Sequence, residues 1–189
     1  LLLHQPISAK ISTTSFLVRW GKYTAFRYVL RRALKRAKRI FVPTNFVAQE
    51  VRGVGVLPER IQKTGEGMVR LPKADSSFVP NGPFLLYVGS AYPHKRLDLL
   101  LEAWSSLVKK YPTYRLVMAG EIDTFMSKYK NHMEKTEQAQ TILFTDRVTD
   151  AQLRGLYEAA DAFVFPSSHE GFGLPPLEAL ALGCPVVAS

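Results

Sequence analysis

Hydrophobic residues in the second half of the chain form short continuous runs, and amphipathic stretches separate them. Continuous apolar runs predict buried strands at residues 84–89, 115–120, 141–144, 162–165 and 185–188. Three- and four-residue spacing of apolar side chains, or helix-capping residues, predict helices at 97–111, 150–160 and 176–182, and the polar stretch 123–138 is also expected to be helical. Short buried strands that alternate with helices predict an α/β fold with a parallel, doubly wound sheet.

The first half has a different pattern. Residues 20–40 show helical periodicity, with Arg and Lys between the apolar positions. A strand is expected within 39–44, then a helix that Thr44 or Asn45 caps and that runs towards Gly53. A short strand is expected at 60–64. Residues 65–83 carry three Gly and three Pro, a density of helix and strand breakers that is typical of a linker.

The composition fits a globular protein and excludes wholesale disorder. Of the 189 residues, 47% are hydrophobic, and no run approaches a membrane span. The single cysteine, Cys184, excludes an internal disulfide and favours a reducing, intracellular setting. The chain starts without Met and ends within an expected strand, so we expect a piece of a longer protein.

The positive charge lies entirely in the first half. The formal net charge is +9, with +11 in residues 1–83 and −2 in residues 84–189. Such a segment attracts nucleic acid, anionic lipid or a phosphorylated substrate. The basic helix at 27–39 is either the solvated face of a packed helix or a patch for anionic lipid. No base-stacking motif supports nucleic-acid binding.

Chemistry is expected where the parallel strands end, because ligands of such sheets bind beyond the carboxyl ends. The densest candidate segment, residues 166–189, carries Glu170 on a loop and Glu178 in the helix after it. Gly171 and Gly173 between them allow close approach of a ligand, and free N–H groups at the helix start favour a diphosphate. Two carboxylates that read hydroxyl groups, beside a phosphate cradle, suit a nucleotide sugar.

A second candidate segment follows the strand at 84–89. Gly89 ends that strand, and Lys95 and Arg96 stand just before a helix. Cations at a helix N-terminus oppose the helix dipole, and a bound diphosphate would relieve this cost.

With these motifs, the stretch from Phe84 to Ser189 resembles the nucleotide-binding half of group 1 glycosyltransferases, a retaining family (family 4) with the GT-B fold of two Rossmann-like domains. The resemblance rests on YVGSAYPHKRLDLLLEAW, RLVMAG, FTDRVTDAQLRGLYEAADAFVFPSSHEGFGLPPLEA and GCPVVAS, which contain the family's pair of glutamates with seven residues between them. It implies that residues 1–64 end an acceptor-side domain, that 65–83 link the domains, and that 84–189 form the donor-nucleotide domain.

The resemblance also implies roles for single residues. Glu178 would hold the ribose hydroxyls, Glu170 the hydroxyls of the donor sugar, and Lys95 the leaving diphosphate. Ser90 stands where the family usually has Arg, so either Arg96 takes a share of phosphate binding or one cation fewer is used. His4 is either the acceptor-domain histidine near the donor sugar or an ordinary histidine. The remaining donor-binding candidates are Gly89, Gly171, Phe172, Gly173 and Leu174.

These roles imply hexosyl transfer from a UDP-sugar or GDP-sugar to a sugar or lipid-linked sugar, in polysaccharide, lipopolysaccharide or glycolipid synthesis. No cofactor and no metal are expected, because no Asp-x-Asp motif occurs and the histidines lack ligand spacing. The expected location is cytoplasmic, with peripheral contact on the inner membrane face through the basic helix as an option. A nucleotide-binding fragment without activity, and an epimerase or phosphorylase of the same fold, stay open as alternatives.

Overall fold

In the computed structural model, which describes residues 16–189 and side chains from Trp20 onward, the chain divides into two compact units. The first unit contains the described residues up to Gly67 together with Glu170–Phe172. The second contains Met68–His169 and Gly173–Ser189. The division after Gly67 falls inside the segment 65–83 that the sequence assigns to a linker.

The first unit is built on two short parallel strands. Its elements are α1 (Phe16–Arg36), β1 (Ile40–Val42), α2 (Asn45–Gly53), the 3-10 helix η1 (Pro58–Arg60) and β2 (Ile61–Lys63). β1 pairs with β2 in register Ile40 with Ile61. The expected helices and strands of this half are therefore confirmed, with α1 ending at Arg36.

Small apolar side chains and two polar contacts hold the first unit together. Val42, Val47 and Val51 belong to its buried cluster. Thr44 is the N-cap of α2, and its hydroxyl accepts from the backbone N–H of Val47, as one of the two expected caps. The guanidinium of Arg60 donates to carbonyl groups at the C-terminal end of α1, those of Leu34, Lys35 and Ala37. These bonds satisfy carbonyls that a helix end leaves without partners.

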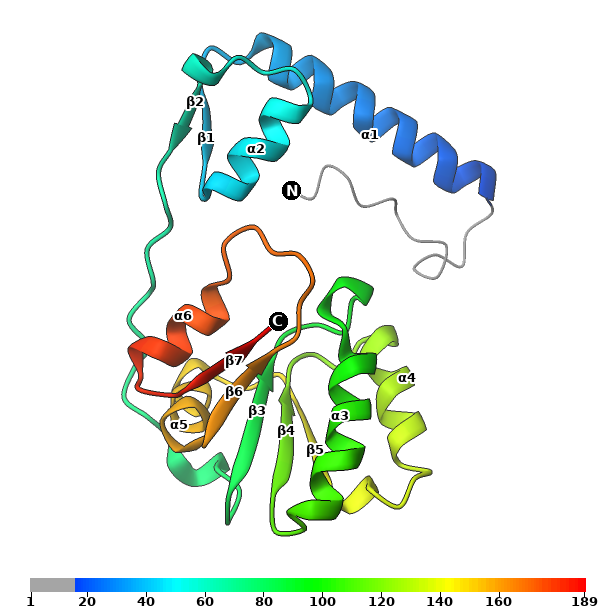
Figure 1. Cartoon of the computed structure of the whole chain (residues 1–189), viewed down its shortest axis with the longest axis vertical. Helices are drawn as coiled ribbons and strands as arrows, with labels where there is room; N and C mark the ends of the chain where they lie inside the picture. Colours follow the sequence, from blue (N-terminus) through cyan, green and yellow to red (C-terminus); the bar gives the residue numbers. More distant parts are fainter. Residues whose placement is uncertain (1–15) are drawn as a thin grey trace. The chain divides into compact units, whose positions relative to one another are not determined.

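The second unit is a five-stranded sheet with helices on both faces (Figure 1). Its strands are β3 (Phe84–Val88), β4 (Arg115–Ala119), β5 (Ile142–Asp146), β6 (Ala162–Phe165) and β7 (Val186–Ala188). Its helices are α3 (Leu97–Lys110), α4 (Thr124–Met133), α5 (Asp150–Ala159) and α6 (Leu174–Ala181), with short 3-10 turns η2 (Ser76–Phe78), η3 (Pro93–Lys95) and η4 (Ala139–Thr141).

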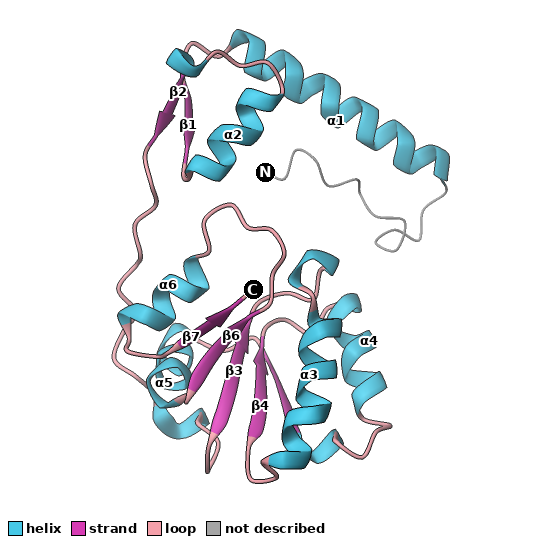
Figure 2. Cartoon of the chain, in the orientation of Figure 1, coloured by secondary structure: helices cyan, strands magenta, loops and turns pink. Residues whose placement is uncertain are grey.

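All four strand pairings of this sheet are parallel, in the order β5-β4-β3-β6-β7 (Figure 2). The chain builds outward from β3 to β5 and then crosses back, so that β6 lies on the other side of β3. This reversal is the topological switch point of a doubly wound sheet. The predicted fold class is confirmed.

Two apolar cores lie on opposite faces of the sheet. One joins α3 and α4 to the sheet, and Trp104 at its centre is 1% exposed. Its indole N–H donates to the hydroxyl of Thr141 over 3.0 Å. The other core joins α5 and α6 to the sheet and contains Leu156, Phe163 and Cys184. Cys184 is a small buried residue of this core, and burial raises the pKa of its thiol.

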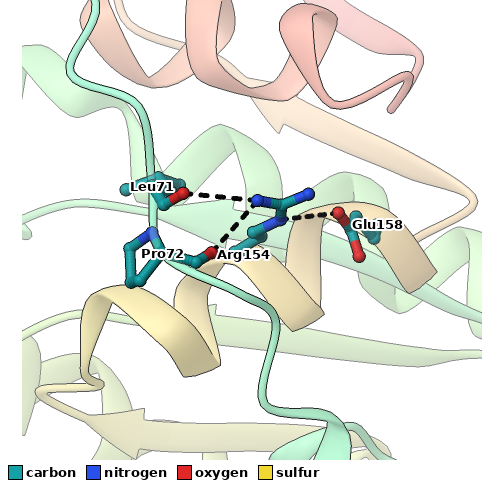
Figure 3. Close-up of polar contacts among 4 residues, drawn as sticks. All are labelled: Leu71, Pro72, Arg154 and Glu158. Atoms are coloured by element: carbon teal, nitrogen blue, oxygen red, sulfur yellow. Dashed lines mark hydrogen bonds and ion pairs between the residues drawn. The ribbon is translucent and has the colours of Figure 1, made fainter.

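The segment before β3, from Leu71 to Val79, packs on α5. Figure 3 shows the guanidinium of Arg154 between the carboxylate of Glu158 and the carbonyl oxygens of Leu71 and Pro72. Its Nε donates to the Glu158 carboxylate over 2.7 Å, and its Nη1 donates to the two carbonyls over 3.3 and 3.1 Å. The N–H of Asp75 donates to the carbonyl of Ala151. Much of the expected linker segment is therefore part of the second unit.

In the second unit, two helices differ from their expected bounds by more than one residue. α4 ends at Met133, because Glu134 to Thr141 form successive turns closed by bonds such as Thr136 N–H to the Met133 carbonyl. α6 begins at Leu174, two residues before the expected start at Pro176, because Gly173 adopts φ +87° and takes the N-cap position.

Gly155 should be essential for the contact between α5 and the segment before β3. A Cβ at Gly155 would collide with the carbonyl oxygen of Asp75. We expect Gly155→Ala to lower the free energy of unfolding by about 1–3 kcal/mol, although alanine favours helix formation. Urea unfolding followed by circular dichroism measures this.

Gly21 provides the matched control, because it also lies in a helix but has no atom within 4 Å of a built Cβ. Gly21→Ala should leave stability unchanged or raise it by up to about 1 kcal/mol. Equal effects of the two substitutions would contradict the packing described here.

Candidate functional site

The loops after β3 and β6 meet at the carboxyl edge of the sheet. Because β3 and β6 are parallel neighbours, both loops leave the same edge. The N–H of Ser168 donates to the carbonyl of His94 over 2.8 Å, and the Ser168 hydroxyl donates to the same carbonyl over 3.2 Å. The ring Nδ1 of His169 lies 3.0 Å from that hydroxyl. Two candidate segments far apart in sequence are thus joined.

Lys95 lies at this junction. It ends η3, is half-buried, and its Nζ lies 5.6 Å from the ring centroid of Phe165, the last residue of β6. A cation over an aromatic face is attracted by the ring, which helps hold the ammonium group at the strand edge. Arg96 follows at the N-cap of α3 with φ +52° and an exposed side chain.

Two glycines let the ends of β3 and β4 approach each other closely. Gly89 has φ +144° and Gly120 has φ +158°, and a Cβ on Gly120 would collide with the carbonyl oxygen of Gly89. The N–H of Gly89 donates to the carbonyl of Ala119. Ser90 offers its carbonyl to the hydroxyl of Tyr87 over 2.7 Å, which fixes the turn after β3.

A pocket of about 490 Å³ opens beyond β3, β4 and β5. Gly89, Ser90 and Tyr92 line it from the β3 loop, and Gly120 and Glu121 line it from the β4 loop. Its volume is in the range of small-molecule sites. The loop that carries Lys95 therefore also forms one wall of a ligand-sized pocket.

Glu178 lies in the second turn of α6 rather than in the first turn, since that helix begins at Leu174. Its carboxylate accepts from the hydroxyl of Tyr157 over 3.3 Å. Desolvation by burial raises the pKa of Glu178, the Tyr157 bond partly offsets this, and the charge of Asp150 adds to the rise. Burial, followed by the nearby Glu178 charge, raises the pKa of Tyr157 as well.

The other candidates of this segment lie on the loop between β6 and α6. Glu170, Gly171 and Phe172 are half-buried and belong to the first unit. Gly173 and Leu174 belong to the second unit and form the start of α6. The two glutamates thus fall in different compact units.

Sequence reasoning missed two side chains at this edge. The hydroxyl of Ser167 is buried and has no hydrogen-bond partner. Its position two residues after a buried strand, within the stretch that carries the family resemblance, was the available signal. Tyr157, fully buried on α5, contacts Glu178, and no motif marks a tyrosine twenty-one positions away.

The remaining sequence predictions concern His4, metal binding and contact with a membrane. His4 lies outside the residues that the structure describes. In the described part of the chain, no cluster of His, Cys, Asp or Glu has a metal-binding arrangement. Among the helices described, none combines the length and apolar character needed to cross a membrane. Trp20, Tyr28 and Val29 of α1 are exposed alongside its basic side chains.

Comparison with known proteins identifies relatives. The model of the family described as glycosyl transferases group 1 matches residues 72–189. The O-antigen chain mannosyltransferase RfbU of Salmonella typhimurium is 28% identical over 169 residues, which are 87% of this chain and 45% of RfbU. A D-inositol 3-phosphate glycosyltransferase of Segniliparus rotundus is 30% identical over 77% of this chain and 34% of its own length. The chain thus spans less than half of these relatives.

Solved structures share the fold. WaaG, a glycosyltransferase involved in lipopolysaccharide biosynthesis, aligns with a TM-score of 0.71 and 23% identity over 93% of this chain and 51% of WaaG. HepE of Anabaena, in complex with UDP-glucose, aligns with a TM-score of 0.73 and 18% identity over 98% of this chain and 51% of HepE.

The partly buried carboxyl of Glu178 predicts a pH-dependent stability difference. Because burial raises its pKa in the folded state, the folded protein holds this proton more tightly than the unfolded chain. Ionisation of Glu178 therefore costs stability as pH rises upward from the ordinary glutamate pKa. Glu178→Gln removes this loss, so the variant should gain stability relative to the wild type between about pH 4 and about pH 7.5.

Urea unfolding of the wild type and of Glu178→Gln at about pH 4 and at about pH 7.5 measures this change in relative stability. Glu102→Gln, at an exposed position of α3, reports the general effect of removing one negative charge. If the free energy of unfolding of Glu178→Gln instead fell relative to that of the wild type as pH rises, the partial burial of this carboxyl would be contradicted.

Proposed function

Because the chain belongs to the group 1 glycosyltransferases, we propose that its complete form transfers a hexosyl group from a nucleoside diphosphate sugar to a hydroxyl acceptor. The acceptor is a sugar or a lipid-linked sugar, and the anomeric configuration is retained. Names of relatives such as the O-antigen chain mannosyltransferase RfbU support a role in polysaccharide or lipopolysaccharide synthesis.

The observation that carries this proposal is the junction of the β3 and β6 loops around Lys95. The ammonium group lies beside Phe165, and the backbone bond between Ser168 and His94 fixes the loop that carries it. A fixed cation at the edge of the sheet suits the charge that develops on a leaving diphosphate. The buried hydroxyl of Ser167 adds a hydrogen-bond donor that a phosphate oxygen would satisfy.

In the proposed step, the bond between the anomeric carbon and the diphosphate oxygen breaks, and the diphosphate takes the electron pair. The acceptor oxygen bonds to the same face of the anomeric carbon, and its proton passes to the departing phosphate oxygen. The charge of Lys95 stabilises the departing group, and no metal ion is needed for this role. Arg96 supplies a second positive charge where Ser90 supplies none.

The remaining roles concern the donor's hydroxyl groups. Glu178, oriented by the Tyr157 hydroxyl, would accept hydrogen bonds from the two ribose hydroxyls. Glu170 would accept from the transferred sugar. Backbone groups of Gly171, Phe172 and Gly173 would contact sugar and phosphate, with Leu174 beside them at the start of α6.

Two substitutions in the complete protein separate binding from chemistry. Lys95→Ala should lower kcat by about 100-fold or more, because it removes stabilisation of the leaving group. Glu178→Ala should raise the donor KM by about tenfold with a smaller effect on kcat, since ribose contacts persist through the reaction. Initial rates of sugar transfer from UDP-hexose and GDP-hexose donors measure both.

Lys109→Ala and Glu102→Ala are the controls, because both side chains are exposed on α3. Wild-type kinetics in both site variants would refute the site, and a product of inverted configuration would refute retention.

A further inference from the structure

An ion pair stands at the rim of the 490 Å³ pocket and has no part in the roles assigned above. Glu121 and Arg147 both line this pocket, and Nη2 of Arg147 lies 2.5 Å from Oε2 of Glu121. The two side chains come from the ends of neighbouring strands β4 and β5. They are 58% and 76% exposed, so folding depends little on their attraction.

The backbone beneath this pair is cross-linked, which fixes the separation of the two side chains. The N–H of Gly120 donates to the carbonyl of Asp146, and the N–H of Ile122 donates to its carboxylate over 3.1 Å. Each of these bonds joins a neighbour of Glu121 to the neighbour of Arg147. Asp146 adopts φ +62° at this point, a conformation that non-glycine residues rarely take.

The other acidic group of the pocket is already engaged. Asp123 caps α4, and its carboxylate accepts from the N–H groups of Phe125 and Met126. Val88, Val148 and Leu153 supply an apolar lining. The pocket therefore combines apolar walls, two glycine turns and a single guanidinium–carboxylate pair that faces solvent, an arrangement typical of a small-molecule site.

We infer that this pocket binds the guanine base of a guanosine diphosphate sugar, with Arg147 and Glu121 as the residues that select it. This inference rests on the proposed function, because it assigns the base of the same donor. The loop from Gly89 to Lys95 connects the pocket to the cation assigned to the diphosphate, as a nucleotide requires.

The hydrogen-bonding edge of guanine is complementary to Arg147 and Glu121. Guanine presents two adjacent acceptors, N7 and O6, followed by two adjacent donors, the N1–H and the 2-amino group. An arginine fork donates to N7 and O6 together, and a carboxylate accepts from the N1–H and the amino group together. Uracil offers one N–H between two carbonyl oxygens, so one of them would face the carboxylate. Adenine and cytosine also lack the pattern of two acceptors beside two donors.

Calorimetric titration of the chain with GDP, UDP and inosine diphosphate tests this inference. Inosine diphosphate differs from GDP only in lacking the 2-amino group, the donor that Glu121 would bind. The wild type should bind GDP about tenfold or more tightly than either of the others. In Glu121→Gln, GDP should bind about tenfold more weakly, and the difference between GDP and inosine diphosphate should largely disappear.

Two further variants define the effect. Arg147→Lys keeps the charge but loses the planar fork, so it should weaken GDP binding and leave UDP binding unchanged. Glu134→Gln is the matched control: Glu134 also forms an ion pair, is 57% exposed, and follows the opposite end of α4 from the pocket. It should bind all three nucleotides as the wild type does.

The outcomes separate this inference from the proposed function. UDP binding as tight as GDP binding, or equal binding of GDP and inosine diphosphate, would overturn the guanine assignment and leave the nucleotide-sugar proposal standing. Binding of none of the three nucleotides would overturn this inference, and the same result with the complete protein would overturn the proposed function as well.

Discussion

The candidate site depends on one constraint, the position of β3 between two parallel neighbours. Its pairing with β4 and with β6 sends three strand-end loops to the same edge of the sheet. The bond from Ser168 to His94 then joins the β6 loop to the β3 loop. The bond from Gly120 to Asp146 joins the β4 and β5 loops in the same way. Charged side chains of the loops after β3, β4 and β5 thereby lie along one edge.

Burial and charge are distributed along this edge in a way that suits a nucleotide. Near the β3–β6 junction, Lys95 is half-buried against an aromatic ring, where a cation acts on a diphosphate with less screening than in open water. Glu178 is partly buried beside Tyr157, which limits the orientations of its carboxylate. At the β4–β5 end, Glu121 and Arg147 are exposed and can exchange contacts with each other for contacts with a ligand. The half-buried cation and the exposed ion pair therefore lie at different ends of the carboxyl edge of the sheet.

The sequence predicts the fold well, because burial in a parallel sheet leaves continuous apolar runs such as AFVF at 162–165, the bounds observed for β6. It predicts less well where a single backbone conformation decides, as at Gly173, whose positive φ starts α6 early. Contacts between distant segments were not predictable: neither Tyr157 beside Glu178 nor the packing of residues 71–79 on α5 follows from any local pattern. The density of Gly and Pro in that segment does not reveal this packing, because Gly and Pro are also common in segments that pack in extended form.

The most direct test of the central claim is amide chemical-shift mapping by NMR while GDP or UDP is added to the chain. The account predicts shifts in the N–H signals of the non-proline residues within Gly89–Arg96 and of residues 167–174, where the β3 and β6 loops meet. Shifts confined to the basic helix α1, with the signals of both loops unchanged, would contradict it.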